Sequence, residues 1–240
     1  MGLIGTSSVT PDGKNMWDAL REFSAKKPTW GTCAGMILLA EQCIGASAVI
    51  QNGQALIGGV EILVCRNYFG SQVSSCEMAT PPPPGGKADE ETYPGIFIRA
   101  PAILSAGPGV TVLGKVVAIP CRQAAVVLQE FERKIENGEK VIQMGVVDAL
   151  DRQSLRASDY RVVIKAPPKD GEEEKKEASA SEDAEKNVIS LPGAADGSNA
   201  REVISAVRKD QLLCTAFHPE LTQDYRWHEY FANMVRESKA

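Results

Sequence analysis

The sequence is poor in several features that other classes of protein require. None of its apolar runs is long enough to span a bilayer, and the N-terminus lacks a basic segment followed by a long apolar one. Its six cysteines form no CxxC pair, which argues against a zinc site and against a disulfide framework. We therefore expect a cytoplasmic protein with reduced thiols, no bound metal and no contact with a membrane.

Positive charge is scarce as well. The formal net charge is −5, and residues 172–186 alone hold seven acidic residues against three lysines, a net of −4 that leaves about −1 for the rest. Nucleic-acid-binding domains carry a basic patch or stripe, and none is visible in this sequence. We therefore exclude nucleic acid as a partner.

The residues that are present suffice for one sizeable core, because 43% of the 240 residues are hydrophobic and 24% are charged. We expect a single domain over residues 1–240. Within it, the segment 166–199 is charged, poor in apolar residues and bounded by prolines and glycines. Burial cannot offset the ordering entropy of such a segment, so the sequence predicts disorder there.

Elsewhere the hydrophobic pattern alternates between helical spacing and short β-rich runs. The helices are expected at residues 16–24, 34–43, 123–137 and 224–236. The strands are expected at residues 57–65, 96–99, 110–119, 141–147, 160–164, 203–207 and 212–217. Interleaved strands and helices predict an α/β fold, with a sheet covered on both faces.

The stretch Gly31 to Gly35, GTCAG, has the G-x-C-x-G form of a nucleophile elbow, in which a strand turns sharply into a helix. We expect both glycines to be required, because a Cβ beside the turn would clash with the backbone. A helix N-terminus lowers the pKa of a thiol, so Cys33 is predicted to tend toward thiolate, and the N–H of Ala34 can face an oxyanion. The alternative is a buried, inert cysteine, which is our interpretation of Cys43.

A cysteine nucleophile needs a base, and the chain has two histidines. Pro219 keeps His218 out of a helix, and in an extended segment residues two apart project to the same side, so His218 and Glu220 are expected to touch. Cys33, His218 and Glu220 then form a candidate triad of nucleophile, general acid/base and orienting carboxylate. His228 is the weaker candidate, and we interpret it as a histidine on the surface of the last helix or facing a partner.

Four segments carry a family resemblance: KPTWGTCAGMILLAE, GGVEILVCRNYFGSQVSSCE, IFIRAP and AFHPELTQDYRWHEYF. Together they resemble the glutaminase subunit of pyridoxal 5′-phosphate synthase, the PdxT/SNO family of class I glutamine amidotransferases. The likeness covers about residues 16–118 and 203–234. It implies a flavodoxin-like three-layer α/β/α fold. IFIRAP and RNYFGSQ make a different class I amidotransferase, or a stand-alone cysteine hydrolase, the less favoured interpretation.

The resemblance also implies an activity, the hydrolysis of L-glutamine to glutamate and ammonia. Cys33 would attack the side-chain amide, His218 would protonate the departing ammonia, and water would cleave the γ-glutamyl thioester. The glutamine contacts of the family carry over to Arg66, Ile98 and Arg99. The partner implied is a (β/α)₈-barrel synthase subunit in a large hetero-oligomer, which takes the ammonia for vitamin B6 biosynthesis. The family implies neither a metal nor a cofactor in this chain.

Two departures from the family pattern matter for activity. The chain has no counterpart of the PGGES loop or of the strands that precede it, and residues 115–199 form an insertion longer than the family's link. PGGES completes the oxyanion hole, and loss of one oxyanion donor costs about a hundred- to a thousandfold in rate. The alternative hypothesis is therefore a catalytically impaired, truncated isoform that acts as a non-enzymatic partner of the synthase.

Overall fold

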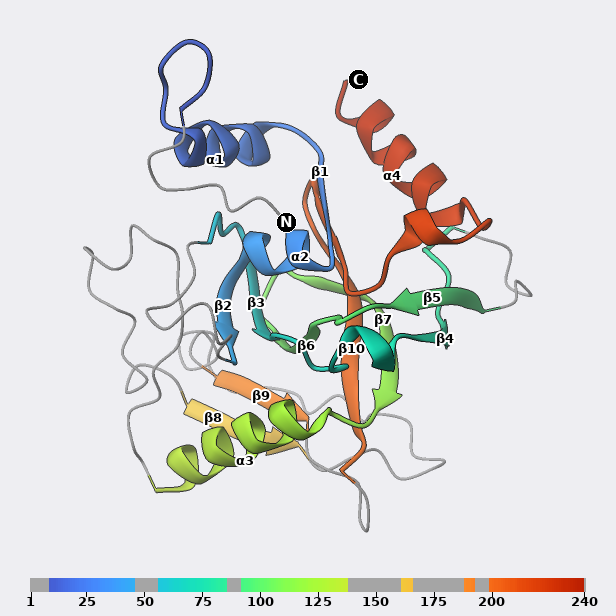
Figure 1. The fold of residues 1–240 in the computed structure, drawn as a ribbon. Coiled ribbons are helices and arrows are strands. Elements are labelled where there is room, and N and C mark those ends of the chain that lie inside the picture. Colours follow the sequence, from blue (N-terminus) through green and yellow to red (C-terminus); the bar gives the residue numbers. More distant parts are fainter. Residues whose placement is uncertain are drawn as a thin grey trace, which may run out of the picture.

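The computed structural model describes residues 9–45, 56–85, 92–137, 161–165, 188–192 and 199–239 (Figure 1). The α-helices are α1 Met16–Lys26, α2 Ala34–Leu39, α3 Arg122–Glu136 and α4 Arg226–Glu237, and 3₁₀ turns span Gln72–Ser74 (η1) and Pro219–Leu221 (η4). The strands are β1 Thr29–Thr32, β2 Ala40–Ile44, β3 Val60–Cys65, β4 Cys76–Thr80, β5 Tyr93–Phe97, β6 Ala102–Ala106, β7 Thr111–Ala118, β8 Arg161–Lys165, β9 Val188–Pro192, β10 Arg201–Lys209 and β11 Leu212–Thr215. None of the helices in these ranges is long and apolar enough to cross a membrane.

A mixed seven-stranded sheet forms the centre of the molecule. Its order is β1-β11-β10-β6-β3-β2, and β7 pairs with β10 outside this order. The pairs β1–β11 and β2–β3 are parallel, whereas β10 is antiparallel to β11, β6 and β7. Within the described ranges, β11 is the sole strand paired with β1, so β1 ends the sheet on one side.

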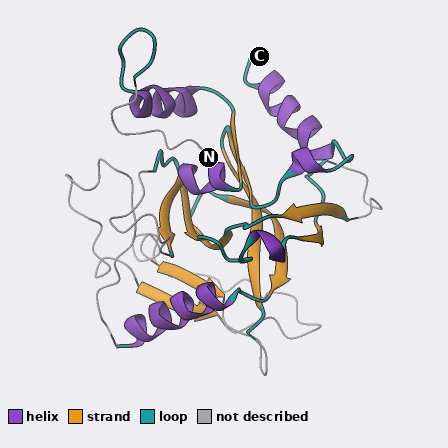
Figure 2. Cartoon of the chain, viewed as in Figure 1, coloured by secondary structure: helices purple, strands orange, loops and turns teal. Residues whose placement is uncertain are grey.

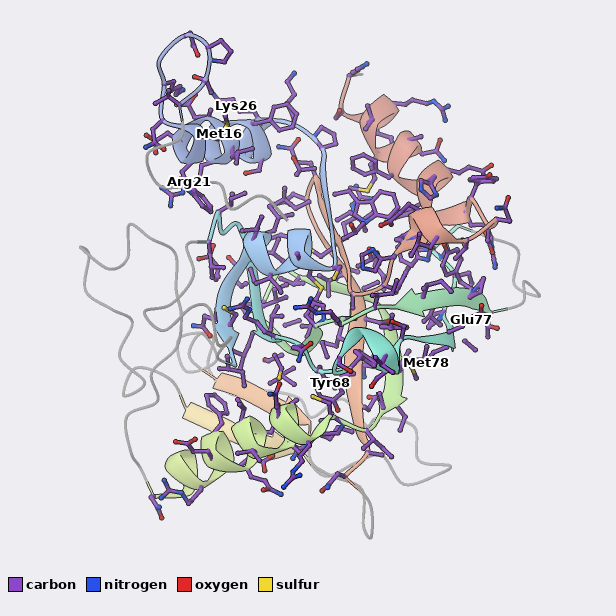
Figure 3. The ribbon with its side chains drawn as sticks, viewed as in Figure 1. Met16, Arg21, Lys26, Tyr68, Glu77 and Met78 are labelled. Atoms are coloured by element: carbon purple, nitrogen blue, oxygen red, sulfur yellow. The ribbon has the colours of Figure 1, made fainter. Side chains whose placement is uncertain are left out.

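The helices lie around this sheet, as the ribbon coloured by secondary structure makes clear (Figure 2). In Figure 1, α1, α2 and α4 occupy the upper part of the view and α3 the lower part. Asn15 caps the N-terminus of helix α1, and its side chain accepts a hydrogen bond from the Trp17 N–H at 2.9 Å. The helix ends before Pro28, because a proline disfavours helical geometry in the residue before it. Arg21 projects from α1 (Figure 3), and its Nη2 donates to the Leu56 carbonyl at 3.4 Å.

The predicted amphipathic helix after β7 is confirmed as α3, whose buried face contains Ala124, Leu128 and Phe131. Tyr68, labelled in Figure 3, ties the start of this helix to the loop after β3. Its hydroxyl donates to the Ala118 carbonyl at 2.9 Å, and its own carbonyl accepts from the Cys121 N–H at 2.8 Å. The residues that connect β7 to α3 are therefore fixed against the sheet.

An aromatic cluster fills the core between β5, the end of β11 and α4. Tyr93, Phe97, Phe217 and Trp227 are all fully buried, and the ring of Phe217 lies 5.5 to 5.8 Å from the other three. Aromatic pairs in such tilted or edge-on geometries add about 0.5–1.5 kcal/mol beyond their burial. This cluster fixes the chain directly before His218.

The α/β class is confirmed, and most predicted elements are found with shifted ends. The helix predicted at 34–43 is wrong in its second half, because α2 ends at Leu39 and Ala40–Ile44 pair with β3 as strand β2. A short apolar run does not distinguish a helix from a buried strand, and the pairing partner decides. Strands β4 and β6 were not anticipated.

The predicted disorder of 166–199 is wrong for Val188–Pro192, which forms strand β9 parallel to β8. The backbone of this short strand pairs with β8, and composition alone does not indicate that pairing. Residues 166–187 and 193–198, like the strand predicted at 141–147, lie outside the described residues.

Candidate active site

Cys33 occupies the turn between β1 and α2 and has a backbone conformation that few side-chain-bearing residues adopt. Its φ is 49° and its ψ is −104°. The Cys33 N–H donates to the Thr215 carbonyl at 2.8 Å, and its carbonyl accepts from the Ile37 N–H at 3.3 Å. A backbone conformation of this kind costs about 1–3 kcal/mol, and it persists where contacts on both sides of the residue hold the backbone in place. The predicted strand-to-helix turn is therefore present.

The two glycines of the motif differ in their surroundings. A Cβ on Gly31 would lie 2.6 Å from both the carbonyl carbon and the carbonyl oxygen of Gly35, closer than real Cβ contacts allow. A Cβ on Gly35 would meet nothing within 4 Å. The expectation that both glycines are sterically required is thus right for Gly31 and wrong for Gly35, because Gly31 faces the backbone of the helix and Gly35 faces open space.

Burial decides the protonation of the thiol. Desolvation raises the pKa of Cys33 above its ordinary value, and the negative charge of Glu220 raises it further, whereas the Ala34 N–H and the positive charge of Arg99 lower it. The sequence-based prediction of a lowered pKa is wrong in its net direction, because the cost of desolvation exceeds the effect of the helix N-terminus. The sulfur is therefore a neutral thiol near neutral pH and needs a base to become a nucleophile.

The predicted contact between His218 and Glu220 is present. Nδ1 of His218 lies 2.7 Å from Oε1 of Glu220. His218 has φ −107° and ψ 89°, and Pro219 begins the turn η4 directly after it. A carboxylate that accepts a hydrogen bond from Nδ1–H leaves Nε2 as the basic nitrogen of the imidazole. The pair has the geometry of an acid/base residue with its orienting group.

Strand β5 brings the cysteine and the histidine to the same region. The Ile96 carbonyl accepts from the His218 N–H at 2.8 Å, and the Ile98 carbonyl lies 3.9 Å from the Cys33 sulfur. In the described part of the chain, no hydrogen bond joins the thiol directly to the imidazole. Catalytic hydrogen bonds are often long in the free enzyme and tighten with substrate.

The predicted glutamine contacts fall in two places. Ile98 and Arg99 lie beside Cys33, as the carbonyl distance and the effect of Arg99 on the thiol require. Arg66 directly follows β3, and its N–H donates to the Ile44 carbonyl at 3.0 Å. Its Nη1 is buried and has no hydrogen-bond partner among the residues the structure describes. A buried guanidinium nitrogen without a partner is costly, and a bound carboxylate would relieve that cost.

His228 is more enclosed than the sequence suggested. Its ring lies 5.4 Å from the ring of Trp30 and 6.0 Å from that of Tyr225, and its Nδ1 is buried without a partner in the described ranges. His228 is therefore half-buried against Trp30, on the strand that leads to Cys33, and its role in facing a partner stays a prediction. No three His, Cys, Asp or Glu side chains of the described residues are grouped so as to hold a metal ion.

Sequence reasoning missed two residues near this site. The phenol of Tyr93 is hydrogen-bonded to the hydroxyl of Thr222 at 2.9 Å, and Thr222 follows the turn that carries Glu220. The available signal was a threonine directly after the Pro-Glu-Leu turn, since Ser and Thr hydroxyls often bond to nearby backbone groups.

A sheet with a cysteine at a strand-to-helix turn places the chain in the class of α/β proteins with a nucleophile elbow. Residues 6–148, more than half of the chain, match the model of the SNO glutamine amidotransferase family. The chain belongs to this family, which confirms the resemblance and the predicted flavodoxin-like α/β fold.

The chain is similar to several curated proteins over most of its length. It is 34% identical over 226 residues to the probable pyridoxal 5′-phosphate synthase subunit PDX2 of Arabidopsis thaliana, covering 93% of this chain and 64% of that protein. It is 40% identical over 208 residues to the pyridoxal 5′-phosphate synthase subunit PdxT of Methanocella arvoryzae, covering 87% of this chain and 60% of that protein. It thus spans less than two thirds of the length of these relatives. A crystal structure of a glutamine amidotransferase has a TM-score of 0.48 and 22% sequence identity over 92% of this chain and 68% of that one.

Proposed function

We propose that this chain is the glutaminase subunit of a pyridoxal 5′-phosphate synthase. It hydrolyses L-glutamine to glutamate and ammonia and passes the ammonia to the synthase subunit. Membership of the glutamine amidotransferase family supports the reaction class. One observation carries the proposal: the thiol and the acid/base pair both contact carbonyls of the segment that contains β5. The Ile98 carbonyl lies beside the Cys33 sulfur, and the Ile96 carbonyl accepts a hydrogen bond from the N–H of His218, which is paired with Glu220.

The reaction begins when Nε2 of His218 removes the proton of the Cys33 thiol. The sulfur attacks the side-chain amide carbon, and the oxygen of the tetrahedral intermediate accepts a hydrogen bond from the Ala34 N–H, which already faces the sulfur. His218 returns the proton to the departing ammonia, and a γ-glutamyl thioester remains. Water, deprotonated by His218, then cleaves the thioester and restores the thiol.

The substrate is held by the charged groups around the thiol. Arg66 and Arg99 supply the positive charge for the carboxylate of glutamine, and the buried, unpartnered Nη1 of Arg66 supports this role. The Ile98 carbonyl is an acceptor beside the sulfur, suited to an N–H of the substrate. Arginine forks favour a carboxylate over a neutral group, because paired N–H donors match its two oxygens.

The partner follows from the product. Ammonia released into water would be protonated and lost, so the subunit works when docked on a synthase. We assign that synthase to the (β/α)₈-barrel class, in a large cytoplasmic hetero-oligomer, and propose that this chain holds neither metal nor cofactor. The names of the relatives, which are subunits of pyridoxal 5′-phosphate synthase, support a synthase partner.

The test is glutamate release from glutamine by the chain purified together with a synthase subunit. We expect activity in the wild type, none above background in Cys33→Ala, and unchanged activity in Cys76→Ala, which removes an exposed thiol from β4. Equal rates for the wild type and Cys33→Ala would overturn the proposal. If the chain still co-elutes with the synthase in that case, the catalytically impaired, non-enzymatic subunit is the correct function.

A further inference from the structure

The carboxylate of Glu220 is poorly confined by its own surroundings. Its side chain is 51% exposed, whereas that of His218 is 21% exposed. A half-exposed glutamate has several rotamers and water as a competing partner, so burial does not hold it at 2.7 Å from Nδ1. The position of the carboxylate therefore depends on what fixes the backbone of the turn η4.

The hydroxyl of Thr222 closes that turn. It lies 3.3 Å from the Pro219 carbonyl, which also accepts the Thr222 N–H at 3.2 Å, and it accepts the Asp224 N–H at 3.2 Å. A hydroxyl has one proton and two acceptor sites. The proton of the hydroxyl can reach either the Pro219 carbonyl at 3.3 Å or the Asp224 carbonyl at 3.2 Å, and the phenol of Tyr93 lies 2.9 Å from the same hydroxyl. The phenol is also 3.4 Å from the Asp224 carbonyl, so the two hydroxyl groups and the backbone of residues 219–224 form one connected hydrogen-bond network.

Tyr93 connects this turn to the strand that holds the rest of the site. Its ring is fully buried in the aromatic cluster, and the Arg226 guanidinium lies 5.7 Å from its centre while donating to the Thr92 carbonyl at 3.1 Å. Burial raises the pKa of Tyr93, so the phenol stays protonated and able to donate. Residues 93–98 of the same segment include the two carbonyls that contact His218 and Cys33.

We propose that Tyr93 and Thr222 are positioning residues for the acid/base pair, through a hydroxyl-to-phenol bond that fixes the turn bearing Glu220 against β5. The proposal rests on the proposed glutaminase function. Among the described residues, neither side chain is hydrogen-bonded to the Cys33 sulfur, and their proposed action is through Glu220 and His218. Their effect is therefore expected on the protonation steps, which set kcat, and not on the binding of glutamine, which the arginines set.

Three substitutions isolate the two hydroxyl groups. Thr222→Val keeps the shape of the side chain and removes its hydroxyl, Tyr93→Phe keeps the ring and removes the phenol oxygen, and Thr222→Ser retains the hydroxyl as the conservative rescue. Tyr225→Phe is the matched control, because this exposed tyrosine lies in the same segment and its phenol makes no hydrogen bond within the described ranges. Each variant is assayed in complex with the synthase subunit.

We expect kcat to fall about ten- to a hundredfold in Thr222→Val and Tyr93→Phe, because a small displacement of a catalytic group causes a loss of this size. The KM for glutamine should stay unchanged. Thr222→Ser and Tyr225→Phe should keep the wild-type kcat. Wild-type kcat in both hydroxyl-free variants would overturn the proposal, and so would a loss that appears equally in KM. If Thr222→Val does not fold, Tyr93→Phe decides, since it removes a single oxygen.

A second readout does not depend on glutaminase activity. The chain has two histidines, so ¹⁵N-labelled imidazole spectra are assigned with one variant, His228→Gln. With neutral imidazole, we expect His218 to carry its proton on Nδ1 in the wild type, Thr222→Ser and Tyr225→Phe. In Thr222→Val and Tyr93→Phe we expect a shift toward the Nε2–H tautomer. An unchanged tautomer in both would overturn the positioning role, whereas an inactive wild type with the expected spectra would overturn only the glutaminase proposal.

Discussion

The two halves of the candidate site are held by different kinds of force. Cys33 is fixed by backbone: strand pairing on one side, the first turn of α2 on the other, and a close approach of Gly31 to that helix. Glu220 and its histidine sit on a more exposed turn that depends on side-chain hydrogen bonds. The thiol side should therefore be sensitive to added volume, and the acid/base side to the loss of single oxygen atoms.

The same contrast is visible in protonation. The thiol is desolvated, and burial outweighs the groups that favour its charged form. Glu220 remains in contact with water and stays close enough to the sulfur to act on it by charge. In the proposed mechanism, the buried half of the site would supply a neutral nucleophile, and the exposed half would supply the negative charge that stabilises the histidine after it accepts the proton.

The largest effect is expected from added volume at the thiol turn. In Gly31→Ala the new methyl group would lie 2.6 Å from backbone atoms of Gly35, and backbone cannot move aside as a flexible side chain would. We expect the free energy of unfolding to fall by about 3 kcal/mol or more. Urea denaturation followed by circular dichroism measures it. A variant within about 1 kcal/mol of the wild type would contradict the idea that backbone packing holds this half of the site.

The sequence carried enough information for the cysteine turn and the His218–Glu220 contact, because both depend on local rules. Glycine spacing indicates a sharp turn, and residues two apart in an extended segment share a side. The bond between Tyr93 and Thr222 joins residues 129 positions apart, and no local rule connects them. Only the folded structure brings these two residues together.

Two sequence-based predictions, the lowered pKa of Cys33 and the length of the helix after it, were wrong because they also depend on contacts between distant parts of the chain. The net direction of the Cys33 pKa depends on how deeply the fold buries the sulfur, and a motif does not report depth. The length of α2 depends on the pairing of Ala40–Ile44 with β3, because an apolar run suits a helix and a buried strand equally. The α/β class itself was predictable, since it follows from alternating periodicities over the whole chain.

A smaller effect is expected on the reactivity of the thiol. Below its pKa a thiol is alkylated about tenfold faster for each unit of rising pH, because the thiolate is the nucleophile. Arg99→Gln removes a charge that lowers the pKa of Cys33 and should slow alkylation by iodoacetamide at fixed pH, whereas Glu220→Gln should speed it. Site-resolved mass spectrometry follows Cys33 separately from Cys43, whose burial raises its pKa to about 11. Changes of the opposite sign would show that these charges do not reach the sulfur.

The same group makes stability depend on pH in a defined direction. The thiol of the unfolded chain ionises near its ordinary value of 9.0, and in the folded protein desolvation raises the pKa of Cys33 above that value. As pH rises beyond 9.0, the unfolded state releases this proton first and is favoured, so the contribution of Cys33 to stability is constant below this pH and falls above it. Cys33→Ser should show less of this loss than the wild type, and the remaining loss reports the other buried thiols and the buried phenols of Tyr68 and Tyr93.

The smallest effect is expected at Gly35, the second glycine of the motif. Gly35→Ala places a methyl group in open space inside helix α2, where alanine is favoured over glycine by up to about 1 kcal/mol. We expect the free energy of unfolding to stay the same or to rise by no more than that. The measurement is made beside Gly31→Ala under identical conditions. The two variants add the same methyl group to the two ends of one turn. A loss of stability as large as that of Gly31→Ala would therefore mean that the whole motif is under steric constraint, and not only Gly31, which faces the helix backbone.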